Sequence, residues 1–190
     1  MENWNEKWQT KIGYIIMRFI MANTLELDVP LIVLADDKRG LIGWGIKAHS
    51  KGNYNHIMEM VDIDHFATQD TVGYRLVNKK KYFKPCYGLK FWKINNLTDK
   101  QRKLWLKTVQ DELSEPWWTR SYDFLGILGQ MLKIRLINNP WTKYCSERIA
   151  SRIRLVLGIK VPKHPSPSEL NKFFNENPEI FTVYGYYFAD

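Results

Sequence analysis

The stretch NPWTKYCSERIASRIRLVLG, residues 139–158, predicts a helix that begins beside a cysteine. Apolar side chains recur behind the cysteine at three- and four-residue steps, and Gly158 ends the pattern. Pro140 and Thr142 lie just upstream, so Cys145 falls in the first turn or at the cap. Free backbone N–H groups and the positive end of the helix dipole lie there, and both favour a thiolate. Cys145 is therefore either a nucleophile or, as most cysteines are, a small buried apolar residue.

The composition describes an ordinary globular chain with a strong positive charge. Its 190 residues suit one domain with an added arm, and a hydrophobic content of 45% supplies a sizeable core. The formal net charge of +8 favours polyanionic partners, namely nucleic acid, anionic lipid or an acidic cell-wall polymer. The sequence has no recognised nucleic-acid-binding motif, so we expect no specific nucleic-acid partner. Cys86 and Cys145 form neither a disulfide framework nor a metal-ligand spacing, so we expect no metal and no cofactor.

The N-terminal segment reads as an amphipathic helical arm over residues 1–28, followed by a single domain over residues 29–190. Its apolar run, residues 12–22, is interrupted by Arg18 and is shorter than the roughly 20 residues that a spanning helix needs. We expect the arm to contact a protein partner, with a lipid surface as the alternative. No secretory signal is visible before it.

The rest of the chain predicts an α+β domain with a largely antiparallel sheet packed against helices. Strand patterns gather in the first half and at the end of the chain: residues 29–36, 54–61, 65–72, 87–95 and 180–189. Helix patterns lie between them: residues 97–113, 121–136, the Cys145 helix and a helix that starts within PSPSEL at 165–170. Thr98 with Gln101, and Ser166 with Glu169, have the spacing of capping boxes.

A thiol nucleophile needs a base, and His56 is the best placed of the four histidines. It opens an apolar strand, so its backbone is well held. We expect its ring nitrogen to lie about 4–5 Å from the Cys145 sulfur, since catalytic hydrogen bonds are often long in unliganded sites.

The group that orients His56 depends on the hairpin register after Val61. A four-residue loop that pairs Val61 with Phe66 puts Gln69 on the face of His56, as a diagonal neighbour. A three-residue loop puts Asp70 directly opposite His56 instead. Val61 and Phe66 are natural shoulders of a hairpin, so this reading favours Gln69, whose amide oxygen can accept a ring N–H.

Five stretches, in this order along the chain, resemble segments of the permuted NlpC-type papain-like cysteine hydrolases, the YiiX-like group. They are LIVLADDKRGLIGWGIKAHSKGNYNHIMEMV (31–61), HFATQDTVGYRLV (65–77), EPWWTRSYDFLG (115–126), KYCSERIASRI (143–153) and PSPSEL (165–170). The resemblance implies a circularly permuted papain-like fold, with the histidine strand before the cysteine helix. It also implies Cys145 as the nucleophile, His56 as the base and Gln69 at a position where the family often has an acidic residue.

The implied chemistry is hydrolysis of an amide bond through a Cys145 thiolate. The backbone N–H of Cys145 can help to hold the oxyanion, and Tyr144 and Tyr54 are further candidates for oxyanion or substrate binding. The family implies peptidoglycan peptides as the substrate, or lipid-like acyl groups for a hydrolase or transferase. The third alternative is a non-enzymatic virion structural protein that keeps the fold.

The implied partner is peptidoglycan or another anionic cell-envelope surface. Arg75, Lys79, Lys80 and Lys81 form the predicted docking patch, and the plain alternative is a solvated strand edge whose lysines block unwanted pairing. The composition, rich in Asn, Lys, Ile and Tyr, is compatible with a bacterial cytoplasmic protein or with a component of a phage virion.

Overall fold

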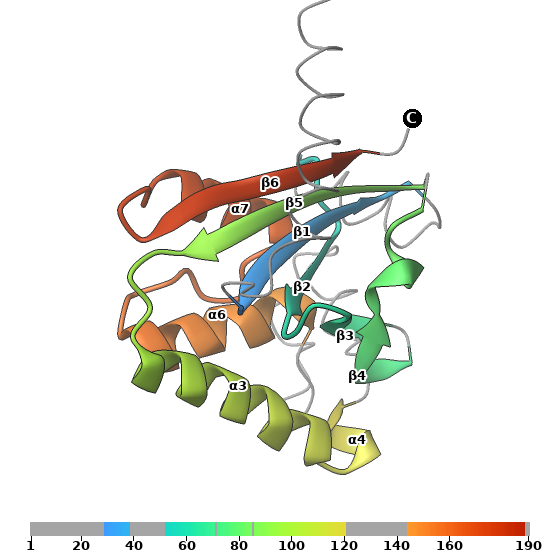
Figure 1. Ribbon diagram of the computed structural model, residues 1–190, viewed down its shortest axis with the longest axis horizontal. Helices are drawn as coiled ribbons and strands as arrows, with labels where there is room; N and C mark the ends of the chain where they lie inside the picture. The colour runs from blue at the N-terminus through green and yellow to red at the C-terminus, as the bar shows by residue number, and fades with distance from the viewer. Residues whose placement is uncertain (1–28, 39–51, 71, 85, 121–143, 189–190) are drawn as a thin grey trace, which may run out of the picture.

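The fold is described by a computed structural model for residues 29–38, 52–70, 72–84, 86–120 and 144–188 (Figure 1). One sheet in the strand order β4-β3-β2-β1-β5-β6 is formed by β1 (Leu31–Asp37), β2 (His56–Met60), β3 (His65–Asp70), β4 (Gly73–Asn78), β5 (Tyr87–Ile94) and β6 (Phe181–Phe188). Every neighbouring pair in it is antiparallel. The helical elements are η1 (Lys79–Lys81), α3 (Asp99–Ser114), α4 (Trp117–Arg120), α6 (Cys145–Leu157) and α7 (Pro167–Asn175).

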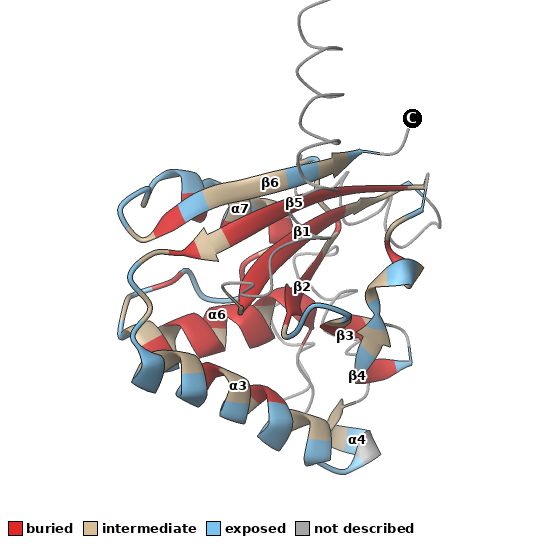
Figure 2. Ribbon diagram, in the orientation of Figure 1, coloured by how far each residue is buried: buried red, intermediate tan, exposed pale blue. Residues whose placement is uncertain are grey.

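The sheet buries both of its faces, as the colouring of its central strands in Figure 2 shows. Ile32, Leu34 and Ile57 point to the face that packs against α3, α6 and α7. Their neighbours along β1 and β2 point to the other face, where they pack with Tyr82 and Phe66. This alternation follows from the two-residue period of a strand, and it places the start of α6 beside the start of β2.

The predicted α+β class and the antiparallel sheet are confirmed. Both capping boxes form: the Thr98 hydroxyl accepts from the Gln101 N–H, and the Ser166 hydroxyl accepts from the Glu169 N–H. Gly158 ends α6 in the left-handed conformation, with φ of 68°. A separate strand β4 was not predicted, because its residues were read as part of a basic patch.

Some expected elements lie outside the described residues. These are the arm at 1–28 and the helix at 121–136. None of the described helices is long and apolar enough to cross a membrane.

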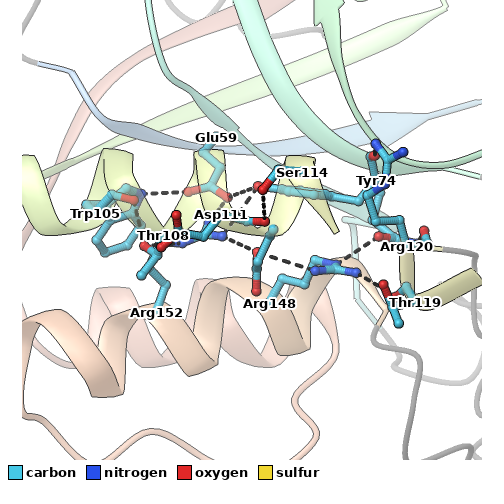
Figure 3. A network of polar contacts seen from close by, with 12 residues as sticks. Glu59, Tyr74, Trp105, Thr108, Asp111, Ser114, Thr119, Arg120, Arg148 and Arg152 are labelled. Carbon is cyan, nitrogen blue, oxygen red and sulfur yellow. Dashed lines mark hydrogen bonds and ion pairs between the residues drawn. The ribbon is translucent and has the colours of Figure 1, made fainter. Parts of the chain in front are cut away.

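A buried polar network joins β2 to α3 and α6 (Figure 3). Glu59 on β2 forms an ion pair with Arg152 of α6, and both side chains are about 1% exposed. The Glu59 carboxylate also accepts from the Trp105 indole N–H at 2.6 Å and from the Tyr74 hydroxyl at 3.0 Å. Glu112 of α3 forms a second ion pair with Arg152. The buried charges of Glu59 and Arg152 are therefore paired and hydrogen-bonded, which offsets the free-energy cost of removing them from water.

Glu59→Gln should lower the free energy of unfolding by about 3 kcal/mol, because it leaves the Arg152 charge buried with less compensation. Asp64→Asn is the matched control, since Asp64 pairs with Lys79 at the surface and such pairs contribute about 1 kcal/mol or less. Urea denaturation with an unchanged m-value is the measurement. Equal losses in the two variants would show that the buried pair does not fix α6 on the sheet.

Candidate functional site

Cys145 is the first residue of α6, as predicted. Tyr144 is the N-cap residue and makes no capping hydrogen bond with its side chain. Cys145 is 5% exposed and packs in the apolar cluster that also contains Ile57 and Ile149. Cys145 therefore lies both at a helix start, which favours a nucleophile, and in an apolar environment, which favours a neutral thiol.

The expected low pKa for Cys145 is wrong. Burial raises the pKa of the thiol to about 11, although hydrogen bonds from the backbone N–H groups of Ile57, Ser146 and Cys145 itself act in the opposite direction. A nearby Glu147 carboxylate adds to the rise. In the unliganded protein at neutral pH, Cys145 is thus a neutral thiol with three N–H groups around its sulfur.

His56 is the first residue of β2, and its ring lies against Thr68 and Tyr82. Its Nε2 lies 2.7 Å from the Thr68 hydroxyl oxygen, and its ring stacks on Tyr82 with centroids 6.2 Å apart. The Thr68 hydroxyl in turn lies 3.2 Å from the Tyr82 hydroxyl. His56 keeps intermediate exposure as a residue. Removal of the ring from water lowers the pKa of His56 to about 4, so the ring is neutral at pH 7 and Nδ1 or Nε2 is free to accept a proton.

No hydrogen bond joins the Cys145 sulfur to the His56 ring among the described residues, and the expected separation of about 4–5 Å stays a prediction. Among the described residues, Thr68 is the one hydrogen-bond partner of His56. His56 and Ile57 point to opposite faces of β2, and Cys145 packs on the Ile57 face.

Tyr82 connects the two faces at this end of the sheet. Its ring stacks on His56, and burial raises the pKa of its hydroxyl to about 12, with a charge on Cys145 adding to the rise. The β2–β3 ladder ends at the pair Met58 and Thr68, so the first two residues of β2 are free of β3 pairing. The Ile57 N–H that reaches the Cys145 sulfur therefore belongs to the part of β2 that is not paired with β3.

The prediction of Gln69 as the orienting residue is wrong. The Val61 N–H donates to the His65 carbonyl at 3.1 Å, so the hairpin loop has three residues and not four. Asp62 explains this short loop, since one of its carboxylate oxygens accepts from the backbone N–H groups of Asp64 and His65. The one-residue difference moves Gln69 to the opposite face of the sheet from His56.

On that face Gln69 belongs to the buried network. Its amide oxygen accepts from Arg148 Nε at 2.8 Å, and its amide nitrogen donates to the Arg120 carbonyl at 2.9 Å. Thr68, and not Gln69, orients the His56 ring. The three-residue loop is the register that puts Asp70 opposite His56. The Asp70 carboxylate, however, binds Arg75 and Lys81.

The two tyrosines proposed for the site have different surroundings. Tyr144 is buried at the N-cap of α6, so its backbone is at the site. The Tyr54 backbone exchanges two hydrogen bonds with the Ser168 hydroxyl. Burial raises the pKa of Tyr54 to about 12, and charges on Tyr186 and Asp36 add to the rise, so its phenol lies toward the β1 and β6 side.

The predicted docking patch of Arg75, Lys79, Lys80 and Lys81 is partly neutralised by two carboxylates of the protein itself, Asp64 and Asp70. Arg75 and Lys81 both bind the Asp70 carboxylate, at 2.7 and 2.8 Å, and Lys79 lies 3.2 Å from Asp64. The Lys79–Lys81 stretch forms η1, capped by Asn78. The arrangement favours a structural role for these side chains over a free cationic surface.

Comparison with known proteins supports the fold. No family model and no curated protein matches the sequence. A solved structure that does match is described as metalloprotein YiiX from Escherichia coli O157:H7, with a TM-score of 0.54 and 14% identity over 84% of this chain and 97% of that one. The likeness shows that the chain has a YiiX-like fold.

The description of YiiX as a metalloprotein raises the question of metal ligands in this chain. Across the described ranges, no group of three or more His, Cys, Asp or Glu side chains is placed to hold a metal ion.

Cys145 should react more slowly with iodoacetamide at pH 7 than the partly exposed Cys86, because its thiol is buried and its pKa is about 11. Its alkylation rate should continue to rise between pH 8 and about 10. Mass spectrometry of the single variants Cys86→Ser and Cys145→Ser follows each site separately. Faster alkylation of Cys145 than of Cys86 at pH 6 would contradict the buried neutral thiol.

Proposed function

We propose that the protein is a cysteine hydrolase that cleaves amide bonds, with Cys145 as nucleophile and His56 as general base. The observation that carries the proposal is the position of Cys145 as the first residue of α6, where its sulfur meets the backbone N–H groups of Cys145, of Ser146 and of Ile57, the residue after His56. Such donors stabilise a thiolate and the oxyanion that follows it. A cysteine that served only to fill space would not need them.

His56 suits the role of base because it is neutral at pH 7. We propose that Nε2–H donates to the Thr68 hydroxyl, which leaves the lone pair on Nδ1 to accept the thiol proton. Thr68 and Tyr82 then hold the ring in this orientation. The hydrogen bond between His56 and Cys145 forms when substrate closes the site, as catalytic hydrogen bonds often tighten only in the Michaelis complex.

The proposed reaction has two steps. The Cys145 sulfur attacks the carbonyl carbon while its proton passes to His56, and the leaving amine takes that proton as the carbon–nitrogen bond breaks. Water then attacks the thioester, gives one proton to His56 and releases the acid as the sulfur is protonated again. Because both groups start neutral, proton transfer accompanies attack and does not precede it.

The order of the elements fits a circularly permuted papain-like domain, with the histidine strand β2 before the cysteine helix α6. We propose peptides of peptidoglycan as the substrate class, since the chain carries a net charge of +8 and an anionic envelope surface would attract it. Because Arg75, Lys79 and Lys81 pair with carboxylates of the protein itself, we propose that this attraction comes from the overall charge.

Hydrolysis of an N-acetyl peptide p-nitroanilide tests the reaction. Cys145→Ala should abolish turnover, and His56→Gln should lower kcat by about 10³-fold, within the range for loss of a general base. Thr68→Val should lower kcat about tenfold, because the imidazole loses its orienting partner and one net hydrogen bond is worth about 1 kcal/mol. Thr182→Val, at an exposed position of β6, is the matched control and should be silent.

Trapping of a thioester on Cys145, seen by intact-protein mass spectrometry with p-nitrophenyl acetate, separates the proposal from its alternatives. Turnover of acyl lipids but not of anilides would assign the site to lipid-directed acyl transfer. No acylation of the wild-type protein with any of these reagents would contradict the enzymatic proposal and favour a non-catalytic structural protein.

A further inference from the structure

Lys90 is a buried cation that the proposed chemistry does not use. It lies in the middle of β5 and is 6% exposed. Its ammonium lies 4.2 Å from the centroid of the Trp92 ring and 5.7 Å from that of Tyr186. It donates one hydrogen bond, to the Asn171 amide oxygen at 3.1 Å, and forms no ion pair with any described residue. Lysines are almost never fully buried without a counter-charge, so this one is under-compensated.

The surroundings of Lys90 present further donors. Because the Asn171 oxygen accepts from Lys90, the amide NH₂ of Asn171 is left to donate elsewhere. The Trp92 indole N–H is buried and has no acceptor within the described part of the chain. Burial lowers the pKa of Lys90, as expected for a charge removed from water. No carboxylate among the described residues forms an ion pair with the Lys90 ammonium.

Two partly exposed aromatic rings of β6 border the position. Tyr186 and Phe188, stacked on each other along the edge strand β6, are 43% and 48% exposed. Asp36 lies at this end as well, since its Cβ and the Phe188 ring both border Gly88. A single cation with a carboxylate in the neighbourhood suits an anion of one charge and disfavours a phosphate of two.

Lys90 lies in the same row of the sheet as the cysteine site. Leu34 of β1 pairs with Ile57 on one side and with Lys90 on the other. The side chains of Lys90 and Ile57 point to the same face of the sheet, because both residues pair with Leu34. Neighbouring strands are about 4.8 Å apart, so the backbones of Lys90 and Ile57 are roughly 10 Å apart. That span is about three residues of extended chain.

We infer that Lys90, with Asn171 and the rings of Trp92 and Tyr186, binds a carboxylate, the C-terminal carboxylate of a short acylated peptide. Binding of the anion supplies the counter-charge that Lys90 lacks, and the aromatic rings flank the chain that carries it. The second part of the inference, which rests on the proposed function, is that this contact fixes the acid end of the substrate while Cys145 attacks a bond about three residues away.

The binding test uses the full chain with Cys145→Ala, so it does not depend on catalysis. N-acetylglycine and its neutral analogue N-acetylglycinamide are the probes, and the lysine side-chain resonances in NMR are the readout, with Lys90 assigned from Lys90→Met. N-acetylglycine should shift the Lys90 resonance saturably, and Lys90→Met should weaken binding about tenfold or more, as expected for loss of a charged hydrogen bond. Lys172→Met, at an exposed position of α7, is the control and should bind as before.

Equal binding of the acid and the amide, or an equal loss in Lys172→Met, would overturn the carboxylate site. Tighter binding of orthophosphate than of N-acetylglycine would overturn the assignment to a monoanion. In the active protein, with Cys145 retained, Lys90→Met should raise KM about tenfold for acetyl peptides with a free carboxylate. It should leave KM unchanged for their amides. Saturable binding of the acid without any turnover would leave the Lys90 site standing and refute the proposed function alone.

Discussion

The ion pair between Glu59 and Arg152 is the contact that sets α6 against the sheet. Glu59 and Ile57 are two residues apart and share a face of β2, while Arg152 and Cys145 are seven residues apart and share a side of α6. Because Glu59 and Arg152 are held together in the core, Ile57 and Cys145 are brought together near the start of β2. There the Cys145 sulfur meets the Ile57 N–H. Arg148, between them on the helix, holds the same orientation through Gln69 and through the Tyr74 ring at 4.5 Å. The polar network thus positions the thiol without touching it.

Burial has opposite consequences for the two groups of the site. It raises the pKa of Cys145 and lowers the pKa of His56, so both are neutral at pH 7 and no thiolate–imidazolium pair exists in the unliganded protein. The backbone N–H groups at the start of α6 compensate part of the cost of a charge on sulfur, but they do not outweigh burial. A site of this kind acquires its charge during the reaction, when the oxyanion and the proton on His56 appear together.

Local patterns in the sequence carried the prediction of the elements, because capping and periodicity act over a few residues. Thr98, Ser166 and Gly158 mark helix ends through their own backbone and side-chain preferences, and the structure confirms them. The orienting residue of His56 depends on one residue of loop length. The Asp62 carboxylate tightens this loop to three residues, so Thr68 and not the predicted Gln69 contacts the His56 ring. The Glu59 network joins residues 46 and 93 positions apart and left no local pattern to read. The contact of Tyr82 with His56 was not predicted, because Tyr82 follows three lysines that indicate a charged surface segment.

The tautomer of His56 is the most direct test of the proposed base. At pH 7 the ¹⁵N resonances of its ring, assigned with His56→Gln, should show a neutral imidazole that is protonated on Nε2 and carries the lone pair on Nδ1. The ring should gain its second proton only near pH 4, in line with its lowered pKa. A ring protonated on Nδ1 at pH 7, or an imidazolium at that pH, would contradict the role of Thr68 as acceptor and of His56 as the base for Cys145.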